Sequence, residues 1–235
     1  IAKPMPGTSG ELALGRLDSQ WIRLEGVGRT VERVADGTRL TLARNHRKYQ
    51  VRINGAAPES LEPMIDARLT VTGVARTVLD DSGQNIGTEV LVAEAGDIHV
   101  DEVAPTNAFT IPPDSIDTLK RFRLNGSYTK RNRTTGTVTL AWPNLVFIDD
   151  GTNTLKARVA RPTGLVPSHR AEVVGFPYLG PRGLEFEDAI VRDLGLAEAV
   201  EPQEMPAQDA RTEGRDGQLI TITGTLLKQV AAVPE

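Results

Sequence analysis

Two stretches near the ends of this 235-residue chain carry nearly the same sequence. GRLDSQWIRLEG (15–26) and EGRDGQLITITG (213–224) align without a gap, 198 positions apart. The identical pairs are Asp18 and Asp216, Gln20 and Gln218, Ile22 and Ile220, and Gly26 and Gly224. Such internal similarity predicts a chain of repeated structural units, and it constrains the fold more than any other feature.

Each copy of the repeat has the pattern of a β-strand. Ile22 and Leu24 alternate with Arg23 and Glu25, and the later copy alternates in the same way. Alternation with period two predicts a strand with one buried face. The glycine that ends each copy interrupts the side chains while the strand pattern continues, which is typical of a bulge or a bend at a barrel corner.

The same strand pattern recurs inside the chain, and it predicts two sets of five strands without a convincing helix among them. Glycine-containing strands recur around Gly73, Gly136 and Gly175. The other expected strands lie at 36–43, 47–54 and 88–100 in the first set, and at 144–151, 154–160 and 184–195 in the second.

These units predict an all-β fold of tandem five-stranded OB-like Greek-key barrels joined by short helical linkers. An SH3-like barrel and a β-sandwich are the structural alternatives. The predicted layout is 1–17 as the tail of a preceding module and linker, 18–103 as barrel 1, 104–123 as a linker with a short helix, 124–196 as barrel 2, 197–215 as a linker, and 216–235 as the first strand of a truncated third module.

Composition excludes several functional classes. The chain has no cysteine, and its three histidines are far apart, so neither a thiolate nor a histidine metal site is expected. No GxSxG, Walker or GxGxxG motif occurs, so we expect no enzyme and no cofactor. The net charge of −4 gives no overall attraction to nucleic acid, which is therefore disfavoured as a partner. No apolar run is long enough to span a bilayer, so membrane attachment would need segments outside this chain.

Several phrases resemble a known family across nearly the whole chain. They are GRLDSQWIRLEGVGRTVER, RLTLA, IDARLTVTGVARTVLDDSGQNIGTEVLV, and GTVTLAWPNLVFIDDGTNTLKARVA with the later AEVVGF and LEFEDAIVRDLG. They resemble the tandem OB-like extracytoplasmic modules of bacterial membrane-anchored signalling proteins such as sensor histidine kinases of two-component systems. The resemblance implies a soluble fragment on the periplasmic or extracellular side of a membrane. The shared motifs are structural ones, so they support fold and setting more than chemistry.

Two sets of residues are candidates for binding. In OB folds the ligand surface is the face of strands two and three, rimmed by the loops between strands one and two and between strands four and five. This places Trp142, Asn144, Phe147, Tyr178 and Arg182 at a candidate ligand patch of barrel 2. The candidate contacts for an anion or nucleic acid are Arg44, Arg47, Lys48, Lys130, Arg131 and Arg133, which stand in the basic stretches 44–49 and 120–133. The simpler interpretation of the first set is that its aromatic residues fill the ends of a barrel or pack between domains. The simpler interpretation of the second set is that its basic residues stand in solvated turns.

The leading functional hypothesis is a non-enzymatic sensing or protein-interaction region of a bacterial receptor, with an unknown small ligand or protein as its partner. The alternative is an OB-fold module that binds single-stranded nucleic acid through basic residues and stacking aromatics. A pure structural spacer is the further alternative.

Overall fold

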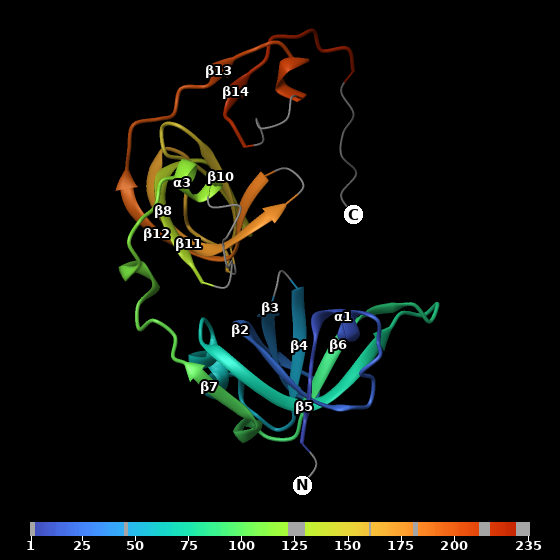
Figure 1. The fold of residues 1–235 in the computed structure, drawn as a ribbon. Helices are drawn as coiled ribbons and strands as arrows, with labels where there is room; N and C mark the ends of the chain where they lie inside the picture. Colours follow the sequence, from blue (N-terminus) through green and yellow to red (C-terminus); the bar gives the residue numbers. More distant parts are fainter. Residues whose placement is uncertain are drawn as a thin grey trace.

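Two β-barrels follow one another along the chain in the computed structural model, and the second lies above the first in Figure 1. The structure describes residues 3–44, 47–121, 130–159, 161–180, 183–211 and 217–228. Short helical elements, η3 (Ala108–Thr110) and α3 (Ile116–Arg121), stand in the segment that joins the barrels.

The first barrel closes in the order β2-β3-β4-β6-β5, and β5 pairs back onto β2. Its strands are β2 (Trp21–Val34), β3 (Gly37–Arg44), β4 (Arg47–Ile53), β5 (Arg68–Leu79) and β6 (Asn85–Val92). The third and fifth of these strands, β4 and β6, run parallel, whereas the other pairs are antiparallel. A helical turn, α2 (Pro58–Leu61) with η1 (Glu62–Met64), connects β4 to β5.

The second barrel repeats this topology. Its strands are β8 (Asn132–Trp142), β9 (Leu145–Asp149), β10 (Thr154–Val159), β11 (His169–Gly180) and β12 (Gly183–Leu196). They form a closed barrel in the order β10-β12-β11-β8-β9, and β10 and β12 are again the parallel pair. Five strands closed in this order form the OB-like Greek key, so the predicted fold class is confirmed and the sandwich alternative is wrong.

Each barrel has a hydrophobic core of its own. Ile22, Leu40, Val51, Leu69 and Val90 are completely buried in the first core, one from each strand of the barrel. The second core is a separate cluster with Val138, Ile148, Ala157, Val173 and Phe186 in the corresponding strands. In β4, β5, β8 and β9 buried residues alternate with more exposed ones, which is why period two was visible in the sequence.

The glycines of the long strands are required by close approach between strands. A Cβ built on Gly26 would lie 2.7 Å from the carbonyl oxygen of Ala43, and one on Gly73 would lie 2.5 Å from that of Leu91. Neither glycine has a positive φ, so space and not backbone conformation selects the residue.

The two ends of the chain repeat each other in structure as well as in sequence. Strand β1 (Met5–Pro6) pairs parallel to β2 with Met5 opposite Ile22, and β13 (Gln203–Glu204) pairs with β14 (Ile220–Thr221) with Gln203 opposite Ile220. Gln203 follows Met5 by 198 positions and Ile220 follows Ile22 by 198 positions, which is the offset of the sequence repeat. The short helices α1 (Ser9–Ala13) and η5 (Asp209–Arg211) occupy corresponding places.

Three details differ from the expected layout. The first 17 residues do not stand apart as the tail of another module, because Leu12 and Leu17 are buried in the first core. The expected strand 88–100 is interrupted by η2 (Ala95–Asp97), so its two parts, β6 and β7 (Ile98–Glu102), pair with different stretches of β5. The expected third-module strand is present only as the two residues of β14, and 212–216 and 229–235 lie outside the described residues.

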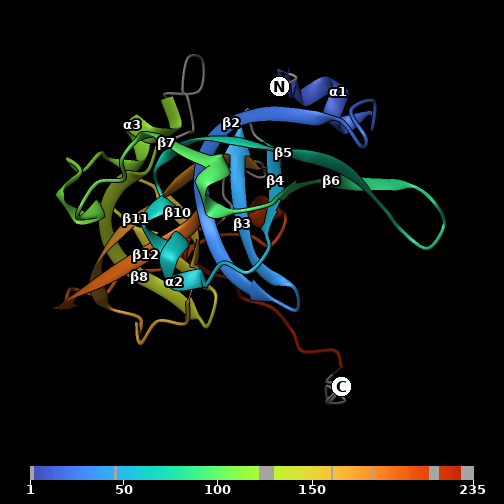
Figure 2. The same ribbon diagram turned by 90° about the horizontal axis from the view of Figure 1, so that it is seen from below.

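The hairpin of β5 and β6 extends beyond the first barrel, as Figure 2 shows. Leu79 and Ile86 near its tip are exposed. Within the described part of the chain, no helix has the length and apolar character needed to cross a membrane.

We predict that Gly73→Ala destabilises the first barrel by about 1–3 kcal/mol, because the added methyl group meets a backbone carbonyl that only a shift of β6 can relieve. Urea unfolding monitored by circular dichroism measures this change. Gly87→Ala in β6 is the matched control, because nothing lies within 4 Å of its Cβ position. Equal stability of the two variants would contradict the close approach.

Candidate ligand face of the second barrel

One row of side chains crosses the outer surface of the second barrel. Phe147 on β9 is opposite Lys156 on β10, Lys156 is opposite Glu185 on β12, and Glu185 is opposite Tyr178 on β11. Residues that are directly opposite in a sheet share a face. The row therefore has an aromatic residue at each end and a charged pair between them, and it lies on the face of strands two and three that OB folds use for ligands.

A second row lies beside the first and carries more apolar surface. Trp142 on β8 is opposite Leu145, and Leu145 is opposite Arg158. Leu140 extends the first row beyond Phe147. Trp142 is 57% exposed and Leu140 is 37% exposed. Neighbouring rows on one strand are about 7 Å apart. The Phe147 ring is half-buried and lies against Gly217 of the C-terminal segment, so the more exposed apolar side chains of this patch are Leu140 and, at its edge, Trp142.

Two cations of this face contact the same buried carboxylate. The Lys156 ammonium is 2.9 Å from Glu185 Oε1, and the Arg158 guanidinium Nε is 3.3 Å from Glu185 Oε2. Glu185 is 7% exposed, whereas the Arg158 side chain is 60% exposed. Two cations share one carboxylate, which leaves one positive charge beside the aromatic residues.

The structure brings most of the predicted ligand residues to this face or its rim. Phe147 and Tyr178 are in one row and Trp142 is in the next, while Asn144 stands in the turn between β8 and β9, where its carbonyl accepts from the Val159 N–H at 3.1 Å. Arg182, at the turn between β11 and β12, lies outside the described residues. Residue alternation in TLKARV was the signal that could have added Lys156 and Arg158 to the prediction.

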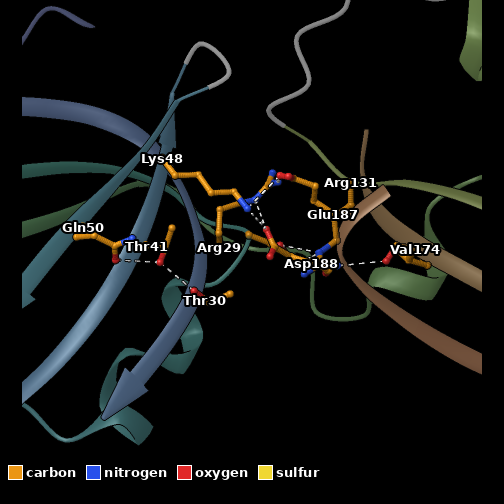
Figure 3. Close-up of polar contacts among 10 residues, drawn as sticks. Arg29, Thr30, Thr41, Lys48, Gln50, Arg131, Val174, Glu187 and Asp188 are labelled. Atoms are coloured by element: carbon orange, nitrogen blue, oxygen red, sulfur yellow. Dashed lines mark hydrogen bonds and ion pairs between the residues drawn. The ribbon is translucent and has the colours of Figure 1, made fainter. Parts of the chain in front are cut away.

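The first barrel has a polar version of the same row. Thr41, Gln50, Glu89 and Arg76 occupy the corresponding positions on β3, β4, β6 and β5. Glu89 is buried and accepts from Arg52 and Arg76, as Glu185 does from its two cations. Thr41 is hydrogen bonded to Thr30 at 3.0 Å and to Gln50 at 3.3 Å, and Figure 3 shows this series. The described positions of the first barrel that correspond to Phe147 and Tyr178 therefore hold Thr41 and Arg76 in place of aromatic residues.

The predicted anion contacts near the linker are mostly paired with groups of this chain. The Lys130 ammonium is 2.8 Å from Glu102, and the Arg131 Nε is 2.7 Å from both carboxylate oxygens of Asp66. The Arg133 guanidinium donates to the Phe109 carbonyl and is 3.5 Å from Glu172. The sequence signal for a basic stretch therefore marked structural cations, and residues 122–129 of that stretch lie outside the described residues.

The predicted contacts in the other basic stretch, 44–49, do not share one role. The Arg44 guanidinium donates to the Gly7 carbonyl at 3.2 Å, and Arg47 is exposed. Lys48 reaches the second barrel, where its ammonium is 3.0 Å from Glu187 and 3.5 Å from Asp188.

A buried cluster joins the two barrels and is drawn in Figure 3. Arg29 of β2 is 5% exposed, its Nε is 2.8 Å from Asp188, and its guanidinium lies 3.3 Å from the centre of the Phe176 ring. Burial lowers the pKa of Arg29, and the Asp188 and Glu187 carboxylates oppose that shift. Arg131 lies over the same ring at 4.6 Å and donates to the carbonyls of Val174 and Asp188.

This cluster explains why Phe176 is not part of the ligand face. Phe176 stands two residues before Tyr178 on β11, but it is completely buried beneath the two guanidinium groups. Within the described residues, no group of three or more histidine, aspartate or glutamate side chains is placed to hold a metal ion.

No protein-family model matches this sequence, and no curated relative is similar in sequence. Among solved structures, the chain is similar to the aspartyl tRNA synthetase from Entamoeba histolytica, with 14% identity over 50% of this chain and 24% of that chain and a TM-score of 0.36. The asparaginyl-tRNA synthetase from Pyrococcus horikoshii has 18% identity over 52% of this chain and 28% of that chain, with a TM-score of 0.35. The chain thus spans about a quarter of the length of these synthetases.

A murine DNA binding protein bound with ds DNA is also similar, with 12% identity over 76% of this chain and 98% of that chain and a TM-score of 0.30. The HINa domain of Ifi202 in complex with 20bp dsDNA has 12% identity over 74% of this chain and 96% of that chain, again with a TM-score of 0.30. Both of these neighbours were solved with double-stranded DNA, which stands against the expectation that nucleic acid is a disfavoured partner. That expectation rested on net charge, which describes the whole surface and says little about one face.

We predict that Asp66→Asn lowers the free energy of unfolding by about 2–3 kcal/mol, because it leaves the buried Arg131 guanidinium without its carboxylate. Asparagine tolerates the positive φ of 69° at this position, so the backbone is preserved. Urea unfolding gives the stability, and small-angle X-ray scattering reports any separation of the barrels. Asp81→Asn in an exposed turn is the control, and an equally small effect of both variants would contradict a role for this ion pair.

Proposed function

We propose that this chain is an OB-fold binding module that holds a single strand of nucleic acid on the outer face of its second barrel. The observation that carries the proposal is the aromatic and cationic face made by Trp142, Phe147 and Tyr178 around Lys156 and Arg158. The proposal involves no catalysis.

Stacking supplies most of the binding energy in this proposal. Every base has an aromatic face, and stacking of a base on an aromatic side chain contributes about 1–3 kcal/mol in proteins that bind single strands. Trp142 is exposed and stands at the edge of the patch, so its indole is accessible to a base. The rows of Trp142 and Phe147 are about 7 Å apart, a spacing that suits successive bases of an extended strand.

Electrostatics plays the smaller part. Lys156 and Arg158 are the cations of the face, and both contact Glu185. Lys130, Arg131 and Arg133 of the predicted basic stretch are paired within the protein, and the net charge is −4. Binding through at most about two phosphate contacts gives a shallow salt dependence, with a slope of log K against log salt concentration of about −1.4 for a single strand.

The extracytoplasmic sensor role remains a second candidate and a prediction. The buried cluster of Arg29, Arg131 and Phe176 favours it, because a module that relays a signal needs its barrels held in a fixed relation. The location on the outer side of a bacterial membrane belongs to this second candidate. The spacer alternative predicts that no ligand binds the aromatic face.

We predict that Trp142→Ala weakens binding of a labelled single-stranded oligothymidine by roughly 5- to 150-fold, which corresponds to about 1–3 kcal/mol of lost stacking. Fluorescence anisotropy at low salt measures the dissociation constant. Trp21→Ala is the matched control, because Trp21 is an exposed tryptophan of the first barrel, far from the face.

Three results would contradict the proposal. They are no binding of the single strand at low salt, equal losses from the two tryptophan variants, and a duplex that binds as tightly as the single strand. A steep salt dependence would instead assign the binding to basic residues outside this face.

A further inference from the structure

A cavity lies between the barrels, on residues that the proposed nucleic-acid face does not use. The first barrel, the segment that follows β7, and the second barrel enclose a cavity of about 710 Å³. That volume is within the range of pockets that take small organic molecules. Three separate parts of the fold contribute to it, through Val27 of β2, residues 103–106 and Phe176 of β11.

Much of the lining is apolar. Val27, Val103, Ala104 and Ile111 face the cavity from the barrel wall and from the connecting segment. Val103 is 79% exposed, which is unusual for a valine that could pack against the neighbouring barrel. Apolar surface held open in a concave site favours a ligand with an apolar body.

The charged groups of the cavity leave positive charge in excess. Lys130 and Arg131 line it, and each has a carboxylate partner, Glu102 and Asp66. Arg44 and Arg68 line it as well, and neither forms an ion pair with any residue in the described ranges. Arg68 lowers the pKa of Glu102 through space, after the larger effect of Lys130.

One further carboxylate belongs to the cavity. Glu25 lines it, so the charged side chains among the described lining residues are four cations and three carboxylates. The excess of one positive charge, beside an apolar wall, suits one anionic group on the ligand. Arginine is the residue best shaped to receive such a group, because its planar guanidinium matches a carboxylate with two parallel hydrogen bonds.

We propose that this cavity binds a small organic monoanion whose carboxylate lies between Arg44 and Arg68 and whose apolar body lies against Val27 and Val103. Arg131 and Phe176 line the same cavity, so a ligand that fills it contacts the second barrel as well as the first barrel and the segment between them. Its binding therefore stabilises their arrangement, because any ligand that binds only the folded state raises stability by mass action.

The test uses straight-chain carboxylates from butyrate to decanoate as probes, with the primary alcohols and primary amines of equal length as controls. Isothermal titration calorimetry and thermal unfolding of the whole chain are the measurements. Carboxylates of intermediate length are expected to bind at one site and to raise the unfolding midpoint, whereas alcohols and amines bind at least about tenfold more weakly. Equal binding of carboxylates and alcohols, or no binding of any carboxylate, overturns the proposal.

Variants assign the binding to the cavity. The double variant Arg44→Gln with Arg68→Gln is expected to weaken carboxylate binding at least about tenfold, and Arg23→Gln is the matched control, because Arg23 is an exposed arginine of β2 outside the cavity. Val103→Asp adds a carboxylate at an exposed position, so it is expected to abolish binding and preserve the fold. Unchanged affinity in the double variant or in Val103→Asp overturns the proposed site. Oligothymidine binding stays intact in all of these variants, which separates this site from the aromatic face.

Discussion

Closure of each sheet is the constraint on which the rest of this protein depends. Five strands laid flat would leave two edges with unpaired backbone groups, and pairing the third strand with the fifth removes both edges. The parallel pairs β4 with β6 and β10 with β12 make that closure. Beside each pair a buried glutamate, Glu89 or Glu185, contacts two cations on the outer surface. Because each barrel is closed and has its own core, the units can be repeated along one chain.

The same closed surface is used in two different ways. In the first barrel the outer row is polar and hydrogen bonded, through Thr41 and Gln50. In the second barrel the corresponding places hold Phe147 and Lys156, with Trp142 in the neighbouring row. The fold thus supplies a common platform, and a few outward-facing positions decide which copy presents an aromatic face.

The basic residues illustrate how position changes the meaning of charge. Arg29 and Arg131 are buried against Phe176 and the carboxylates of the opposite barrel, where they contribute to the contact between the barrels. Arg44 and Arg68 stand at the edge of the same contact and form no ion pair within the described ranges. Arginines of both kinds look alike in a sequence, because a side chain's partners come from strands far away along the chain.

The sequence alone determined the all-β class, the repeat of the units and the strands with their inward faces, because alternation and glycine spacing are local consequences of the pleat and of close strand contacts. It also predicted that Trp142, Phe147 and Tyr178 lie near one face of the second barrel, since their strands could be numbered. Only the tertiary structure decided that Phe176 is buried, that Lys130, Arg131 and Arg133 are paired, and that the chain's first residues belong to the first barrel. Those outcomes depend on which surfaces meet when the barrels pack together. Such packing joins residues far apart in the chain, so it produces no repeating pattern in the sequence.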